Sequence, residues 1–151
     1  MKKLAIVAVV LVSGLAFADE AKLSCPAGTR QAGGSKSQLE ATLCMKVLAD
    51  GSRVFHGPYI AWWPNGQQQA VGQNEEGWRT GHWVFFDQNG VKTGDTDFVH
   101  GDFHGKRIQY WSNGKVMMEE QYDHGRQLSV KTFDQNGVAI APQQLGVQVR
   151  K

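Results

Sequence analysis

The 151-residue sequence has little of several features that define common protein classes. It contains only two cysteines, too few for a multi-disulfide scaffold or for a zinc site built from cysteines. Its one long apolar run lies at the N-terminus, so no later segment is expected to span a membrane. These absences exclude the cysteine-rich and membrane-spanning classes for the body of the chain.

The chain also lacks an excess of charge of either sign. It has 16 Lys and Arg residues against 14 Asp and Glu residues, and removal of Lys2 and Lys3 would leave 14 of each. The remaining basic residues are scattered rather than clustered. A near-neutral chain of this kind has no electrostatic footprint for nucleic acid or for an anionic membrane.

Catalytic motifs are absent as well. No Gly-x-Ser-x-Gly elbow, His-Glu-x-x-His motif or Cys–His pair occurs. The segment Gly33–Ser37 lacks the second half of a phosphate-loop motif. The carboxylates of Glu75-Glu76 and Glu119-Glu120 are adjacent in sequence, so on a strand they point to opposite faces. We therefore expect no catalytic residues, no cofactor and no enzymatic activity.

Metal sites are not expected either. Asp95, Asp97 and Asp102 resemble a calcium loop, but Val99 and His100 occupy positions that need an oxygen ligand and a glycine. A metal site made of stacked imidazoles is the alternative for the five histidines: His56, His82, His100, His104 and His124. Most of them precede a glycine of the repeat described below, which explains their positions without a metal.

The N-terminus has the order of a secretory signal peptide. Lys2 and Lys3 precede an apolar run over residues 4–15, and Ala16-Phe17-Ala18 offers small residues for cleavage before Asp19. We expect residues 1–18 to be removed and the protein to be exported, to the periplasm of a Gram-negative-like bacterium or to the medium. A retained N-terminal anchor is the alternative.

Export bears on the two cysteines, Cys25 and Cys44. In an oxidising compartment an even number of cysteines favours a disulfide, which here closes a loop of about 20 residues and contributes around 3 kcal/mol. Two free thiols are the alternative. Residues 19–52 are thus expected to form a disulfide-tied N-terminal segment, in which only residues 37–43 have a weak helical pattern.

The rest of the chain, residues 53–151, repeats about every 24 residues. Asn-Gly recurs at intervals of 24, 24 and 23 residues, and two further glycine series keep the 24-residue step. Asn-Gly between β-rich runs predicts a hairpin with a type I′ turn. The predicted turns are Asn65-Gly66, Asn89-Gly90, Asn113-Gly114 and Asn136-Gly137.

These signals predict an all-β fold: an elongated antiparallel meander of about four hairpins in one twisted sheet. Alternation places an apolar series on one face: Ile60, Trp62, Val84, Phe86, Ile108 and Tyr110. The other face carries a candidate binding strip: Tyr59, Trp63, Trp83, Phe85 and Trp111. Aromatic strips bind partners well, but the same residues are equally suited to a core.

The repeat resembles the MORN-type variant repeats of many bacterial proteins. The best matches are the segments 56–58, 63–67 and 122–125, and the resemblance covers about residues 53–140. The lead-in around Cys25 and Cys44 is similar to a disulfide segment that precedes such repeats in exported proteins. The family implies an elongated sheet without known catalytic residues. The fourth unit departs from the pattern, with Leu128 and Ser129 where the opening glycine is expected.

The sequence therefore predicts a non-enzymatic module that binds another protein or scaffolds an envelope component. One alternative is a carbohydrate or cell-wall binding domain that uses Trp63, Trp83 and Trp111. Another is an inhibitor of a secreted toxin or hydrolase, because some members of the family are labelled antitoxins.

Overall fold

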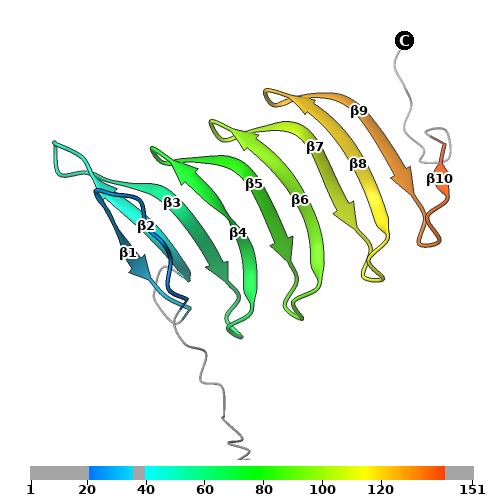
Figure 1. Ribbon diagram of the computed structural model, residues 1–151. Helices are drawn as coiled ribbons and strands as arrows, with labels where there is room; N and C mark the ends of the chain where they lie inside the picture. The colour runs from blue at the N-terminus through cyan, green and yellow to red at the C-terminus, as the bar shows by residue number, and fades with distance from the viewer. Residues whose placement is uncertain (1–20, 36–39, 142–151) are drawn as a thin grey trace, which may run out of the picture.

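The computed structural model describes residues 21–35 and 40–141. The predicted signal peptide, residues 1–18, lies outside the described residues. Ten strands form one antiparallel sheet, and their order in the sheet is their order in the sequence. Figure 1 shows this single layer. The strands are β1 (Thr29–Gly33), β2 (Ala41–Val47), β3 (Arg53–Trp62), β4 (Gln68–Glu75), β5 (Trp78–Phe86), β6 (Lys92–Val99), β7 (Asp102–Tyr110), β8 (Val116–Asp123), β9 (Arg126–Phe133) and β10 (Ala139–Ile140).

The predicted all-β meander is confirmed. The described residues contain no helix, and none of them forms a helix that could cross a membrane. The weak helical pattern at residues 37–43 was misleading, because Ala41–Leu43 belong to β2. The hairpin β1–β2 and the pairing of β2 with β3 continue the sheet into the N-terminal segment. The expected boundary at residue 52 therefore falls in a turn within one continuous sheet.

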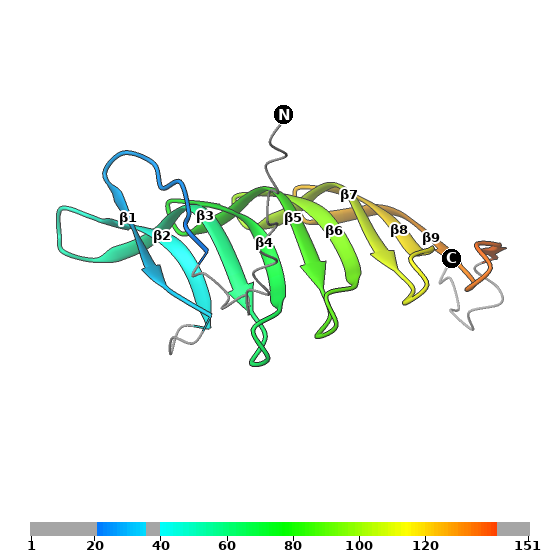
Figure 2. The same cartoon turned by 60° about the horizontal axis from the view of Figure 1, so that its bottom comes forward.

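Three of the four hairpins closed by Asn-Gly have a register shift beside the turn, whereas the paired residues of β9 and β10 have none. The shifts lie at Ala61/Trp62 in β3, Phe85/Phe86 in β5 and Gln109/Tyr110 in β7, one repeat apart. Such β-bulges bend a strand and increase its twist. The strands accordingly curve along their length in both views (Figures 1 and 2).

The turn type predicted for Asn-Gly is wrong. Only the glycines have positive φ; the four asparagines do not. In the first unit the amide of Gly66 donates to the carbonyl of Trp63, and the amide of Trp63 donates to that of Gln67. This is a type I turn followed by a left-handed glycine, a three-residue loop whose first position suits Pro64.

The two-residue type I′ turns lie at the opposite edge of the sheet. Glu76-Gly77, His100-Gly101 and His124-Gly125 each have positive φ at both residues. The strand partners directly flank these pairs, as at Glu75 and Trp78. The repeat thus alternates two kinds of turn, one along each edge of the sheet (Figure 1).

The N-terminal segment covers the first strands of the sheet. Cys25 and Cys44 form the predicted disulfide. Pro26 lies over Gly57, where an added Cβ would approach the proline Cδ to 2.6 Å. All of Ala41, Thr42, Leu43 and Cys44 are buried, whereas the first six residues of β9 are exposed. Near the N-terminal end of the sheet β2 is therefore well buried, whereas β9 near the C-terminal end is largely exposed.

Candidate functional site

Six aromatic rings form a continuous row across the sheet from β3 to β8. Successive rings lie 5.9, 5.5, 6.0, 5.0 and 5.1 Å apart between centroids. Such separations are typical of favourable aromatic pairs. We call this set the aromatic row: Phe55, Tyr59, Trp83, Phe98, Phe103 and Tyr122.

Trp83 is the fixed centre of the aromatic row. Its side chain is 1% exposed, and its indole N–H donates to the carbonyls of Gln73 and Thr80. The ring lies directly over Gly72, where an added Cβ would come within 2.2 Å of it. Phe85 also stacks with the Trp83 ring, with centroids 6.4 Å apart. Trp83 is therefore core, and the face is built around it.

Two arginines lie on the aromatic row. The Arg79 guanidinium lies 4.6 Å from the Trp83 ring centroid and 5.5 Å from that of Phe98. Arg107 lies 5.0 Å from the centroid of Phe103 and also pairs with the buried carboxylate of Glu120. Tyr122 and Gln127 donate to the other Glu120 oxygen, which completes its hydrogen bonding.

Arg79 differs from Arg107 in having no acidic partner. No carboxylate of the described residues lies within ion-pair distance of its guanidinium, and the side chain is exposed. The rings hold the planar group by cation–π attraction while its N–H donors remain open. A carboxylate or phosphate on a partner is the group that this arrangement would accept.

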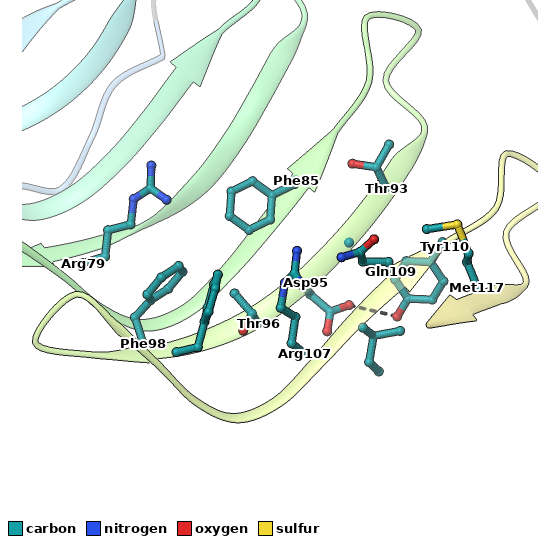
Figure 3. Close-up of a pocket in the computed structure, with 13 residues that line it drawn as sticks. Arg79, Phe85, Thr93, Asp95, Thr96, Phe98, Arg107, Gln109, Tyr110 and Met117 are labelled. Carbon is teal, nitrogen blue, oxygen red and sulfur yellow. Dashed lines mark hydrogen bonds between the residues drawn. The ribbon is translucent and has the colours of Figure 1, made fainter. Parts of the chain in front are cut away.

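A hollow of about 520 Å³ opens beside Arg79 (Figure 3). Its wall combines apolar rings with a few polar groups, the composition that is typical of binding pockets. Its lining includes Arg79, Phe85, Thr96, Phe98, Phe103, Arg107 and Gln109.

A buried acidic group supports the far side of this hollow. Asp95 is 9% exposed and accepts a hydrogen bond of 2.9 Å from the Tyr110 hydroxyl (Figure 3). It also forms an ion pair with Lys92. The Asp95 hydrogen bond raises the pKa of Lys92 above its ordinary value. Burial, reinforced by Asp95, raises the pKa of the Tyr110 hydroxyl.

The structure brings together three of the five residues of the predicted strip. Tyr59, Trp83 and Phe85 are in contact. Trp63 and Trp111 lie instead at the Asn-Gly edge, where their indole N–H groups donate to the carbonyls of Phe86 and Phe133 in the next repeat. These two tryptophans join successive hairpins, and the aromatic row does not include them.

The sequence did not predict the other members of the aromatic row or Arg79. They lie on the return strands or near the type I′ turns. Phe98 and Tyr122 are 24 residues apart, as are Phe55, Arg79 and Phe103. The same repeat counting that identified the strip, applied to these positions, would have found them.

The remaining candidates for chemistry lie near the edge that carries the type I′ turns. His82 contacts Asp97 at 2.9 Å, and His56 contacts Glu76 at 3.2 Å. Lys46 is the main cause of a lowered Glu76 pKa, and the His124 hydrogen bond lowers that of Asp123. The Asp95 carboxylate forms an ion pair with Lys92, and the Asp97 carboxylate contacts the His82 ring.

The fold and this face define the class of protein: the described residues form a single-layer β-repeat sheet with an aromatic face. Residues 103–124 match the model of the family described as MORN repeat variant. This segment comprises most of β7, all of β8 and the first residue of the following turn. The chain therefore carries a MORN-variant repeat, and the resemblance drawn from the sequence is confirmed.

Other comparisons add little. No curated protein matches the chain. One solved structure is similar, a crystal structure of a mutant of S. aureus TarM in complex with fondaparinux, alpha-GlcNAc-glycerol and UDP. The identity is 14% over 75% of this chain and the TM-score is 0.32. The chain spans 19% of the length of that protein.

Proposed function

We propose that the protein is an exported, non-enzymatic repeat module that binds another protein or an envelope component through its aromatic face. The observation that carries this proposal is Arg79, which lies over two rings beside an open hollow and pairs with no carboxylate of the described residues. Buried aromatic anchors with an adjacent arginine are the groups that dominate the energy of protein interfaces.

Export is part of the proposal. It is supported by the signal-like N-terminus and by the disulfide between Cys25 and Cys44, since disulfides persist in oxidising compartments. Mass spectrometry of the protein recovered from its source should find a chain that begins at Asp19 and has no thiol that reacts before reduction.

Binding is tested with an exposed charge reversal that leaves the core intact. The disulfide-intact protein is immobilised and incubated with envelope extract, and the captured partner is then purified and its affinity measured. Arg79→Glu should abolish this binding, and added salt should weaken it, because an acidic partner group contacts Arg79. Arg126→Glu, an exposed reversal on β9, serves as the matched control and should leave binding unchanged.

The partner's identity also separates the alternatives. A captured secreted toxin or hydrolase would make the module an inhibitor. Carbohydrate binding would have used Trp63, Trp83 and Trp111 as one platform, and these residues occupy separate places. If Arg79→Glu and Arg126→Glu bind the partner equally well, the proposed face is wrong.

A further inference from the structure

A cluster of metal-ligating side chains lies at the turn between β8 and β9, apart from the aromatic hollow. One ligand atom each from His104, Asp123 and His124 lies within 4.8 Å of the others. The two imidazole rings are 4.6 Å apart between centroids. His104 belongs to β7, and the other two residues end β8 and begin the turn.

A single carboxylate oxygen faces both rings. Asp123 Oδ1 lies 2.8 Å from His124 Nδ1 and 3.8 Å from His104 Nδ1. Arg126 approaches the other oxygen, Oδ2, at 3.7 Å. One edge of the carboxylate is thus occupied by a cation, and the other is directed at two nitrogen donors.

The backbone fixes these groups in place. His124 is the first residue of a type I′ turn, with φ of 46°. The amide of Gly125 donates to the carbonyl of Phe103 at 2.8 Å, which ties the turn to β7 beside His104. A longer contact of 3.4 Å joins the His124 amide to His104 Nδ1. The donor set is therefore held by the strands themselves.

The same three positions in the other repeats do not form this set. One repeat earlier they are Thr80, Val99 and His100, with a single possible ligand. Two repeats earlier they are His56, Glu75 and Glu76, and there Lys46 already lies 2.6 Å from the Glu76 carboxylate. Among the described repeats, two imidazoles and a carboxylate meet only in the third unit.

We propose that His104, Asp123 and His124 bind a divalent transition-metal ion of the zinc class. Two imidazole nitrogens and one carboxylate oxygen suit zinc with a fourth position left for water or an external ligand. Calcium and magnesium prefer all-oxygen sites and are not expected. The ion would fasten β7 to the β8–β9 turn at the poorly covered end of the sheet.

The test is calorimetric titration of the untagged, disulfide-intact protein with zinc chloride. One equivalent should bind, and the melting temperature should rise with zinc. Replacing zinc by Co²⁺ provides a visible absorption spectrum as a direct readout of coordination. His104→Ala should lower the affinity for zinc at least about tenfold and abolish the rise in melting temperature. Loss of a group that only orients a metal ligand already costs about tenfold or more in affinity, and loss of the ligand itself should cost no less.

His82→Ala is the matched control, because His82 also contacts a carboxylate but belongs to no group of three possible ligands among the described residues. This variant should bind zinc like the parent. Equal zinc binding by the two variants, or no binding by the parent, would overturn the proposal.

The repeat also allows the site to be added elsewhere. Thr80→His combined with Val99→Asp places the same set around His100, so the folded double variant should bind a second equivalent of zinc. A folded double variant that binds only one equivalent would contradict the geometric basis of the proposal.

Discussion

Gly72 lies directly under the Trp83 ring, and its lack of a side chain sets the position of the whole aromatic row. In Gly72→Ala the new Cβ would need to occupy space within 2.2 Å of the indole, so the ring must move. We expect destabilisation by about 1–3 kcal/mol, the usual cost of overpacking a core. Urea unfolding followed by tryptophan fluorescence measures it.

The cost of Gly72→Ala should depend on the ring. In a Trp83→Val background the space above Gly72 is open, and the same substitution should cost much less, as a double-mutant cycle would reveal. An equal cost in both backgrounds would mean that the strand itself requires glycine there.

The free energy of unfolding is expected to change with pH in the alkaline range, because of the contacts among Asp95, Lys92 and Tyr110. The folded pKa values of Lys92 and Tyr110 are raised from ordinary values of 10.5 and 10.0. The stability that these two groups contribute is therefore fully present at pH below their ordinary pKa values. It is lost as the pH rises through their raised pKa values in the folded protein. The urea midpoint should fall above about pH 10.

Lys92→Met should reduce the loss of stability at alkaline pH, and Tyr110→Phe should reduce it as well. Lys106→Met is the control, since Lys106 pairs with Glu119 at 3.6 Å on the surface and such pairs contribute little. A parent midpoint that stays constant to about pH 11 would show that the Asp95 cluster is not coupled to folding.

At the scale of the hairpin, local signals predicted the strands and the turn positions well, but not the turn type. Asn-Gly located the turns of four hairpins, β3–β4, β5–β6, β7–β8 and β9–β10, because glycine adopts the positive φ required there without strain. The turn type depends on how the strands pair around it. All four hairpins pair across a three-residue loop, and β9–β10 does so without a register shift. The pairing involves residues beyond the dipeptide, so the dipeptide could not reveal the turn type.

The turn assignment has a direct test in the second unit. Gly90 has φ of 79°, whereas Asn89 does not have positive φ and is held through its backbone amide, which donates to the Asp87 carboxylate. Gly90→Val should destabilise by about 1 kcal/mol or more, because a β-branched residue resists positive φ. Asn89→Ala should cost under about 0.5 kcal/mol. A type I′ turn would make both substitutions costly, and thermal unfolding distinguishes the two cases.

The pairing of the N-terminal segment was also beyond sequence reasoning. Thr29–Gly33 and Ala41–Val47 have no repeat to mark them, and residues 37–43 suggested a helix. The sheet edge offered by β3 decides the outcome, since Leu43 pairs with Tyr59 and Thr42 with Ile60. Tertiary pairing of this kind routinely overrides a weak local preference.

At the scale of the molecule, the single layer makes stability local. Each strand contacts chiefly the strand before it and the strand after it. In such linear arrays stability is approximately a sum of unit and neighbour terms. Leu128 and Val130 of β9 are 52% and 49% exposed, whereas β2 holds four consecutive buried residues. Backbone hydrogen exchange should therefore be slow in β2–β6 and fast in β9–β10.

Reduction of the Cys25–Cys44 disulfide tests whether that locality is real. The bridge joins residues 19 apart at one end of the sheet, so its loss should cost about 3 kcal/mol only for the unit that it closes. Hydrogen–deuterium exchange with and without reductant should show faster exchange in β1–β3 and unchanged exchange in β7–β8. A uniform acceleration through β8 would mean that the sheet unfolds as one cooperative body. The aromatic row, which spans β3 to β8, would then be the element that couples its two ends.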